Sequence, residues 1–381
     1  MPFRQEKSGF ARVANFYIDT IAPFIEIAIS HYNYGETMQI NGQEYRSVWF
    51  EHARVKMIDQ NKLPFAFEIR EYSSYLEVAA AIRDMTVRGA PAIGAAGAYG
   101  LAMAAQSAPE EKFRAYLRSA RDELISARPT AVDLSIGVNS VYESTLKFIP
   151  DLVHARQVAL LAANEFANRS AAECLELGNR GAELIKEGYR ILTHCNAGAL
   201  ATVDHGTALA VIRQAHKQGK NIFVYVDETR PRLQGARLTA FELEQEGIPH
   251  AIIADSAAGF YFWKNEIDLV ITGTDRICLN GDIANKIGTY EKAVMAKVHD
   301  VPFYVAAPLS TFDFGCAKGE DIPIEIRDEA EIKYIGESCI ANPGSIALNP
   351  SFDITPASYI TKIITPKGIF EPSEAAQKVQ Q

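Results

Sequence analysis

Residues 191–200 read Ile-Leu-Thr-His-Cys-Asn-Ala-Gly-Ala-Leu, and the rest of the chain is organised around this stretch. An apolar run begins it, and polar or small residues that include Cys195, Asn196 and Gly198 follow. A buried parallel strand that ends in a loop has this pattern, because small residues allow a ligand to approach the backbone. We therefore predict that Cys195 lies at the centre of a small-molecule site.

The second half of the chain alternates strand-like and helix-like segments. Apolar runs predict strands at 189–194, 221–226, 250–254, 269–272 and 302–306, and helical spacing predicts helices at 207–217, 236–246, 256–263 and 285–298. This alternation predicts an α/β fold with a Rossmann-like, doubly wound parallel sheet. Ligands of such sheets bind beyond the carboxyl ends of the strands.

The first half is predicted to be mainly helical, after a small β element. Residues 44–69 indicate strand–turn–strand with the turn at 59–62, and helical patterns follow at 73–85, from Gly94 to about 106, at 109–127 and at 154–185. We therefore divide the chain into an N-terminal extension (1–45), a mainly helical domain (46–187) and the α/β domain (188–381). The 381 residues are enough for two or three domains of about 150 residues each.

Composition excludes several classes of protein. With 38 basic and 47 acidic residues the formal charge is 38 − 47 = −9, and no basic stripe is visible, which argues against nucleic-acid binding. The apolar run at 17–30 contains Asp19, Pro23 and Glu26 and is too short and too charged to span a bilayer. The cysteines are odd in number and widely spaced without a C-x-x-C motif, which favours a reducing compartment, most simply the cytosol. They are Cys174, Cys195, Cys278, Cys316 and Cys339.

Four polar loops follow the predicted strands. They contain Cys195, residues 227–234, residues 273–276 and residues 280–286. Because the carboxyl ends of parallel strands share one edge of a sheet, these loops are expected to converge on one site. Four converging loops are a stronger signal than any one of them.

Two arginines stand at helix junctions in the first half. Arg88 precedes Gly89-Ala90-Pro91, where backbone N–H groups and a helix N-terminus could face an anion. A tight helix–helix contact that needs small residues explains the same motif equally well. Arg128 precedes a proline that ends a helix, although an arginine in such a place is more often a solvated surface residue.

Several residues could carry chemistry. Cys195 could be a reactive thiol or a small buried hydrophobe, and Asp275 could be a proton donor raised in pKa by burial or a simple turn former. Asn285 and Lys286, which we place at the start of a helix, could bind a phosphate or hydroxyl, and Gln234, in a loop with Arg230 and Arg232, could bind a hydroxyl. A solvated loop is the alternative for each. Histidines do not cluster with carboxylates at ligand spacing, so a structural or catalytic metal is not expected.

The motifs together resemble one known family. Arg88-Gly-Ala-Pro-Ala-Ile-Gly94, Thr193-His-Cys-Asn-Ala-Gly-Ala199, Asp227-Glu-Thr-Arg-Pro-Arg-Leu-Gln234 and Gly273-Thr-Asp-Arg276 with Asn280-Gly-Asp-Ile-Ala-Asn-Lys286 resemble the methylthioribose-1-phosphate isomerases. That family shares its fold with the regulatory subunits of translation initiation factor 2B. The resemblance extends from about Val55 to Phe370. The chain departs from the family pattern at Ile326, where the family has an acidic residue.

The resemblance implies an aldose–ketose isomerase of methionine salvage, a route of methionine and amino-acid biosynthesis. It would act on a sugar phosphate in the cytoplasm as a homodimer, without a redox cofactor, and the apolar content of residues 16–29 is compatible with a dimer contact. Asp275 is implied as the proton donor and Cys195 as the second catalytic group. Substrate binding is implied for Arg88, Gly89, Ala90, Arg128, Gln234, Asn285 and Lys286.

Other functions remain open at this point. The sugar could be 5-deoxyribose 1-phosphate or ribose 1,5-bisphosphate, or the chain could be a non-catalytic regulatory subunit, although the presence of both Cys195 and Asp275 argues against the latter. A Rossmann-type dehydrogenase would need a G-x-G-x-x-G motif after the first strand of the sheet, which is missing there. For the isomerase, Cys195 could act as a thiolate base or as a hydrogen-bonding group during a hydride shift. An apolar wall expected at Tyr261, Phe262 and Trp263 slightly favours the hydride shift.

Overall fold

The computed structural model describes residues 37–129 and 131–381, and residues 38–381 form one compact unit. The stretches at 16–29 and 17–30 lie outside the described residues. Among the helices that the structure describes, none has the length and apolar content that a membrane crossing needs. The division at residues 187 and 188 remains a prediction, because the contacts join both sides of it into the same unit.

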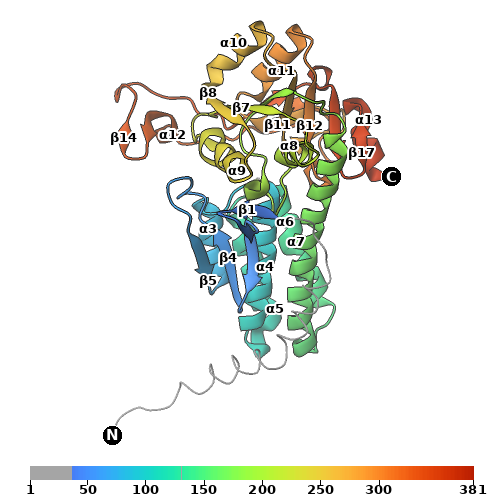
Figure 1. The fold of residues 1–381 in the computed structure, drawn as a ribbon. Helices are drawn as coiled ribbons and strands as arrows, with labels where there is room; N and C mark the ends of the chain where they lie inside the picture. The colour runs from blue at the N-terminus through green and yellow to red at the C-terminus, as the bar shows by residue number, and fades with distance from the viewer. Residues whose placement is uncertain (1–36, 130) are drawn as a thin grey trace. The chain divides into compact units, whose positions relative to one another are not determined.

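A seven-stranded sheet organises the second half of the chain (Figure 1). Its strand order is β17-β16-β12-β9-β6-β7-β8, with only β17 antiparallel to its neighbour. The predicted α/β fold is therefore confirmed, but the sequence patterns missed β16 and β17. The strands are β6 (Arg190–Thr193), β7 (Phe223–Asp227), β8 (His250–Ile253), β9 (Leu269–Thr272), β12 (Phe303–Ala306), β16 (Lys362–Thr365) and β17 (Gly368–Phe370).

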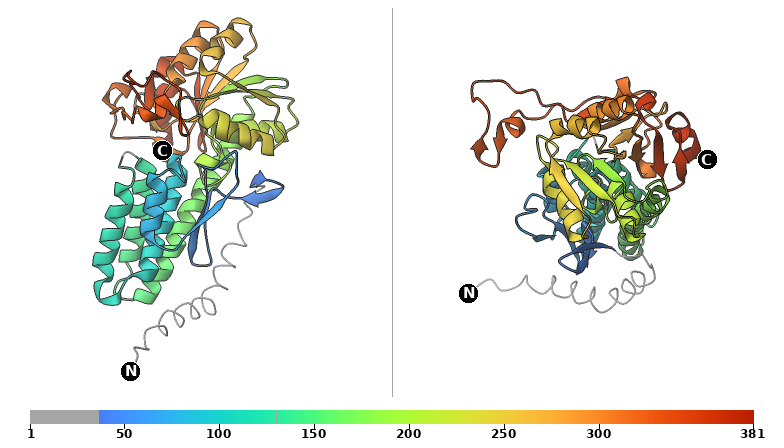
Figure 2. Two further views of the ribbon diagram at one scale, coloured as in Figure 1. Left: turned by 90° about the vertical axis from the view of Figure 1, so that its left-hand side faces the viewer. Right: turned by 45° about the horizontal axis from the view of Figure 1, so that its top comes forward.

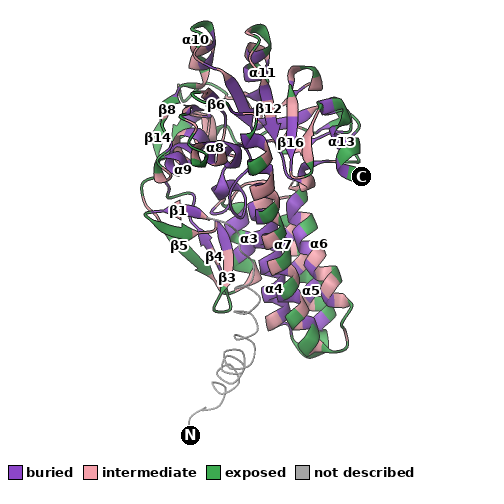
Figure 3. Cartoon of the chain, turned by 45° about the vertical axis from the view of Figure 1, so that its right-hand side comes forward, coloured by how far each residue is buried: buried purple, intermediate pink, exposed green. Residues whose placement is uncertain are grey.

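Helices cover both faces of this sheet, as a doubly wound fold requires (Figure 3). Ile191 packs with residues of α7 and α8 on one face, whereas its neighbour Leu192 packs with residues of α10, α11 and α13 on the other. Successive strand residues point to opposite faces, so continuous apolar runs give two cores. The covering helices are α7 (Leu152–Ala182), α8 (Ala208–Lys217), α9 (Ala240–Gln245), α10 (Ala258–Trp263), α11 (Thr289–Val298) and α13 (Pro372–Gln380).

The first half supplies a helical bundle (Figure 2). It consists of α3 (Tyr75–Arg83), α4 (Ala90–Ser107), α5 (Phe113–Ser126) and α6 (Val132–Leu146), which pack with α7. Helix α4 is almost entirely buried, and a Cβ added at Gly94 would come within 2.8 Å of the carbonyl oxygen of Asp133 in α6. The alternative explanation of the small-residue motif, a tight helix–helix contact, is therefore correct for Gly94.

Small β elements precede the bundle. They are β1 (Met38–Ile40), β2 (Gln43–Tyr45), β3 (Val48–Glu51), β4 (Arg54–Ile58) and β5 (Ile69–Tyr72). The predicted turn at 59–62 falls in the connection between β4 and β5, where the Lys62 amide donates to the Asp59 carbonyl at 3.1 Å. The sequence patterns missed a second turn, between β3 and β4 at His52 and Ala53, both with positive φ. The hairpin β1–β2 belongs to the compact unit rather than to a separate extension, since the Met38 amide donates to Asp204 Oδ1 at 3.0 Å.

A second, three-stranded sheet carries part of the predicted site. It has the order β10-β11-β15, with β10 (Arg276–Ile277), β11 (Ile283–Lys286) and β15 (Phe352–Thr355). Asn285 and Lys286 thus end a strand, and the prediction that they begin a helix was wrong, because α11 starts only at Thr289. Their backbones pair with β15, which fixes the direction of both side chains.

A segment with α12 (Ala330–Lys333), β13 (Tyr334–Ile335) and β14 (Ser338–Cys339) extends away from the large sheet (Figures 1 and 2). Short helical turns complete the structure. They are η1 (Glu110–Lys112), η2 (Ala199–Ala201), the π-helical η3 (Gly235–Thr239), η4 (Asp255–Ala257), η5 (Leu309–Thr311), η6 (Gly319–Asp321) and η7 (Ala357–Tyr359).

Candidate active site

The site lies where the strand order of the large sheet reverses. Strand β6 pairs with β9 on one side and with β7 on the other, and the chain leaves β6 and β9 on opposite sides of this point. Cys195 stands two residues beyond β6, and Asp275 stands three residues beyond β9. A crevice opens at the carboxyl ends of the strands at such a switch point, which is where doubly wound proteins bind ligands.

One cavity at this crevice is lined by all nine residues that the sequence analysis proposed for the site. They are Arg88, Gly89, Ala90, Arg128, Cys195, Gln234, Asp275, Asn285 and Lys286. They come from the start of α4, the turn before α6, three loops of the α/β region and the end of β11. The expected convergence of the loops is therefore observed, while the catalytic and binding roles of these residues remain predictions.

Two threonines hold the backbone of Cys195. The Cys195 amide donates to Thr229 Oγ1 at 2.9 Å, and the Cys195 carbonyl accepts from Thr239 Oγ1 at 2.7 Å. Cys195 has φ = 63°, a left-handed conformation that costs a non-glycine residue of order 1–3 kcal/mol. The two hydroxyls fix the peptide groups on both sides of this strained residue and so determine where its thiol points.

The environment of Cys195 favours the neutral thiol. Burial raises the pKa of Cys195 above its usual value, and the charges of Arg88 and Lys286 offset this rise only in part. A raised thiol pKa means a smaller thiolate fraction at neutral pH. Cys195 is therefore better suited to donating a hydrogen bond than to acting as a strong base.

The carboxyl group of Asp275 faces the cavity. Much of the Asp275 side chain is uncovered, but the uncovered surface belongs to a recess enclosed by protein, so the group is poorly solvated. This desolvation raises the pKa of Asp275, against the opposing charges of Lys286 and Arg88. A carboxyl group that keeps its proton near neutral pH can serve as a general acid.

A chain of buried polar groups orients Arg88. Its guanidinium donates to the Asn196 carbonyl at 3.2 Å and to Asn196 Oδ1, while its Nε donates to Gln60 Oε1 at 3.2 Å. The Asn196 amide in turn donates to the buried carboxylate of Glu242 at 2.8 Å. Arg88 is therefore fixed beside the cavity before any ligand arrives.

The α/β region contributes a second cation and two amides to the cavity. Lys286 Nζ donates to the Ser351 carbonyl at 2.7 Å and lies 4.5 Å from the ring centroid of Phe352. Asn285 Nδ2 donates to Thr289 Oγ1 at 2.9 Å. Gln234 is buried, and its Oε1 has no hydrogen-bond partner among the described residues, which leaves it free to accept from a ligand hydroxyl.

Gln234 lines the cavity, whereas Arg230 and Arg232 of the same loop contact Ile332 and Glu331 of the α12 segment. One expectation about the site was wrong. The expected apolar wall at 261–263 does not line the cavity, because Phe262 points from α10 into the core on one face of the large sheet and Trp263 is 67% exposed. The argument for a hydride shift from that wall therefore fails.

The sequence analysis also missed several lining residues. The structure adds Met85, His194, Arg327 and Phe352 to the cavity wall. His194 lies inside the recognised motif at 193–199, so its position gave a signal. Nothing in the local sequence pairs Met85 with Arg327, because 242 positions separate them. In the structure Arg327 Nη2 lies 3.7 Å from Met85 Sδ.

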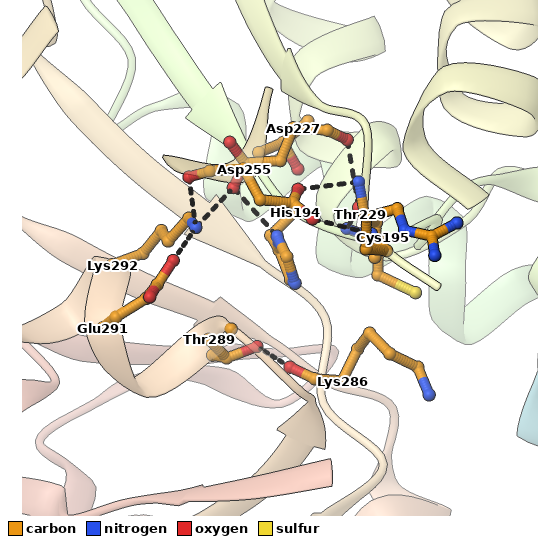
Figure 4. Close-up of polar contacts among 12 residues, drawn as sticks. His194, Cys195, Asp227, Thr229, Asp255, Lys286, Thr289, Glu291 and Lys292 are labelled. Carbon is orange, nitrogen blue, oxygen red and sulfur yellow. Dashed lines mark hydrogen bonds and ion pairs between the residues drawn. The ribbon is translucent and has the colours of Figure 1, made fainter. Parts of the chain in front are cut away.

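A histidine–carboxylate cluster lies next to Cys195, contrary to the expectation that no such cluster exists (Figure 4). His194 Nδ1 lies 2.8 Å from Asp227 Oδ2, and His194 Nε2 lies 2.8 Å from the Ile287 carbonyl, which can only accept a hydrogen bond. Lys292 Nζ lies 3.5 Å from Asp227 Oδ2 and donates to the Asp255 carbonyl at 2.8 Å. Lys292 thus places an ammonium group against Asp227, and both histidine nitrogens are already engaged.

Comparison with known proteins gives consistent matches. Residues 86–372 match the Initiation factor 2 subunit family. A methylthioribose-1-phosphate isomerase from Acetivibrio thermocellus is 51% identical over 328 residues, which cover 84% of this chain and 94% of the relative.

Solved structures resemble the chain over most of its length. A 5-methylthioribose 1-phosphate isomerase from Pyrococcus horikoshii superposes with a TM-score of 0.84 at 42% identity, covering 88% of this chain and 95% of that one. A structure described as the delta subunit of translation initiation factor eIF-2B from A. fulgidus superposes with a TM-score of 0.81 at 41% identity, covering 89% of this chain and 100% of that one.

Proposed function

Because the chain belongs to the Initiation factor 2 subunit family and, within it, to the methylthioribose-1-phosphate isomerases, we propose that it converts 5-methylthioribose 1-phosphate to 5-methylthioribulose 1-phosphate. This is an aldose–ketose isomerisation of methionine salvage. The observation that carries the proposal is the meeting of Cys195 and Asp275 in one cavity with four cationic side chains, in an otherwise acidic protein.

The reaction needs an acid and a path for one hydrogen. A phosphate on the anomeric oxygen prevents spontaneous ring opening, so the ring oxygen must be protonated as its bond to C1 breaks. The protonated carboxyl of Asp275 is suited to this step. Hydrogen then moves from C2 to C1, and the C2 hydroxyl loses its proton to become the ketone. Asp275, left as a carboxylate by the first step, is the group to which this proton can return.

Binding is assigned to the cationic walls. Arg88 comes from the segment before α4, Arg128 from the turn before α6 and Lys286 from the end of β11, and each could form a charge-assisted hydrogen bond with the phosphate. Gly89 and Ala90 bring the start of α4 to the cavity without side-chain bulk, which supports contact with backbone N–H groups. Gln234 and Asn285 are assigned to sugar hydroxyls.

The test is a panel of sugars. Purified protein is incubated with 5-methylthioribose 1-phosphate, 5-deoxyribose 1-phosphate and ribose 1,5-bisphosphate, and ketose formation is measured. We expect the highest kcat/KM for the methylthio sugar. No ketose from any of the three would contradict the enzymatic proposal and revive the regulatory-subunit alternative, while preference for another sugar would correct the substrate only.

A homodimer in the cytoplasm is the finer part of the proposal. The segment around α12–β14 exposes large apolar side chains, including Ile335, Ile340, Ile346 and Leu348, and an exposed patch of this kind usually marks an interface. Light scattering at micromolar concentration should give twice the chain mass, and Ile346→Lys should lower it. A monomer for the unmodified protein would contradict the dimer.

A further inference from the structure

We propose that Cys278 and Cys316 form a disulfide site, at which an intramolecular bond ties the β10–β11 hairpin to the segment after η5. The two sulfur atoms lie 2.9 Å apart although the residues are 38 positions apart in the sequence. This distance is shorter than two sulfur atoms reach in ordinary packing, and both thiols are free in this structure. The inference is independent of the reaction proposed above.

The backbones beside the two cysteines are fixed to each other. The Leu279 amide donates to the Cys316 carbonyl at 2.9 Å, and the Asp313 amide donates to the Ile277 carbonyl at 2.9 Å. The two segments therefore run side by side at the cysteines, as a disulfide requires of its Cα atoms. The sulfur contact thus follows from the register of the main chain as well as from the choice of side-chain rotamers.

The surroundings suit a bond between two neutral sulfurs. Cys278 is fully buried and Cys316 is 7% exposed, within a small cluster that includes Ala284 and Ile322. Cys316 Sγ also donates to the Lys318 carbonyl at 3.3 Å, and a disulfide would give up only this weak hydrogen bond. By contrast, Cys339 on β14 is exposed, and its Sγ donates to the Ala341 carbonyl at 3.2 Å.

A bond between Cys278 and Cys316 would affect the candidate active site, because the pair lies next to one wall of the cavity. Asp275 immediately precedes β10, and Asn285 and Lys286 end β11, so the hairpin that contains Cys278 also bears one wall of the cavity. A covalent tie between this hairpin and the segment after η5 would hold that wall against local unfolding. Because the sulfurs are already in contact, the tie should leave the cavity unchanged.

The chemistry is thiol–disulfide exchange with a small aliphatic disulfide as oxidant. The thiolate of Cys316, the less buried of the two, attacks one sulfur of the oxidant and expels the first small thiolate. The thiolate of Cys278 then attacks Cys316 Sγ, forms the protein disulfide and expels the second. Two protein thiols are oxidised, one small disulfide is reduced to two small thiols, and the protons lost by the cysteines are returned to these products. In a reducing cytosol the pair stays as two thiols until oxidants of this class accumulate.

The experiment uses hydroxyethyl disulfide and the full-length protein. After incubation a few degrees below the unfolding temperature, remaining thiols are alkylated and the peptides are mapped by mass spectrometry. We expect a peptide pair joined through Cys278 and Cys316, while Cys339 carries a mixed disulfide with the reagent. The melting temperature should rise by about 2–5 °C, since closing a loop of this length stabilises the folded state. Cys316→Ser should lose both the linked peptide and the rise, and Cys278→Ser provides the same test from the other side.

The reagent could reach a buried pair of cysteines only slowly, so a refolding experiment serves as the control. Protein unfolded in urea and refolded in the same disulfide buffer has passed through states in which every thiol is exposed. If that protein regains its full native signal and its two cysteines are still alkylated as separate thiols, or carry separate adducts, the proposal is overturned. Equal melting temperatures with and without the mapped bond would overturn its stabilising role.

Discussion

The backbone amide of Cys195 donates a 2.9 Å hydrogen bond to the side-chain hydroxyl of Thr229, a residue that follows the neighbouring strand β7 (Figure 4). Thr229 is itself fixed, because its amide donates to Asp255 Oδ1 at 2.7 Å and its hydroxyl donates to the Asp227 carbonyl at 3.0 Å. The cluster around Asp227 is thus joined to the candidate catalytic thiol through one threonine.

Thr229→Val should lower turnover without weakening substrate binding. Valine keeps the shape of the side chain but cannot accept from Cys195, so the strained loop relaxes and the thiol shifts. A misplacement of this kind costs about 10- to 100-fold in kcat, with KM changed less than about threefold. Thr229→Ser restores the hydroxyl and should recover most of the rate. A serine variant as slow as the valine variant would show that packing, and not the hydrogen bond, matters at this position.

Arg88→Ala should raise KM for a sugar phosphate by about 10- to 100-fold, because a charge-assisted contact is lost in a shielded cavity. Arg230→Ala is the matched control, since its guanidinium bonds the Ile332 carbonyl away from the cavity. Steady-state kinetics of both variants make the comparison. An unchanged KM for Arg88→Ala would remove this residue from phosphate binding.

Asp133 should make the protein less stable as pH rises. Asp133 is buried in the α6 wall beside the cavity, and burial raises the pKa of Asp133 from 3.8 to about 6, although a hydrogen bond with Ser310 offsets part of this rise. A pKa raised in the folded state gives a stability contribution that is complete below pH 3.8 and is lost as pH rises through about 6. This difference between the folded and unfolded pKa of Asp133 corresponds to about 3 kcal/mol in the free energy of unfolding.

Asp133→Asn should therefore stabilise the protein more at pH 8 than at pH 5, because the amide cannot ionise. Thermal unfolding at the two pH values measures this, with the exposed Asp122→Asn as the control. Equal effects of Asp133→Asn at both pH values would mean that the carboxyl finds a partner when it is charged.

The sheet and the site edge were predictable because both depend on local patterns. Continuous apolar runs such as 269–272 can only be buried on both faces, and residues that follow such runs must gather at one edge. That rule placed Cys195 and Asp275 together although 80 positions separate them.

The errors came from features that local sequence does not encode. Asn285 and Lys286 have a helix after them, but pairing with β15 made them a strand, and that partner lies far along the chain. Met85, Glu242 and Arg327 reach the site or its supports through tertiary packing alone. The proximity of His194, Asp227 and Asp255 likewise depends on three different strand ends. Spacing along the chain could not reveal any of these contacts.

Asp275→Asn should abolish turnover, by about 10²- to 10⁴-fold, while substrate binding changes less than about threefold. The amide has nearly the shape of the carboxyl group but no proton of suitable acidity. Isothermal titration with substrate separates binding from turnover, and Asp313→Asn, on the neighbouring segment, is the control. Since burial raises the pKa of Asp275, the wild-type rate should be constant at low pH and fall as pH rises through that raised value. A rate that instead rises with pH over this range would indicate that the carboxylate, and not the acid, is the active form.

The raised pKa of Cys195 leads to the last prediction, which concerns how hydrogen moves from C2 to C1. A neutral thiol is a poor base, so we expect a hydride shift in which Cys195 only donates a hydrogen bond. Substrate deuterated at C2 and converted in ordinary water should then keep its label at C1 of the ketose, as measured by mass spectrometry. Loss of the label to solvent would contradict the hydride shift.

A retained label has a second explanation, a thiolate base shielded from solvent, and substitution of Cys195 separates the two. Cys195→Ser keeps a hydrogen-bond donor but removes the thiol, whereas Cys195→Ala removes both. If the thiol acts by hydrogen bonding, the serine variant should be faster than the alanine variant and should still retain the label. If the thiolate is the base, both variants should be equally slow. Near wild-type turnover of Cys195→Ser together with Cys195→Ala would exclude Cys195 from catalysis, and the interpretation of the loop at 191–200 would then be wrong.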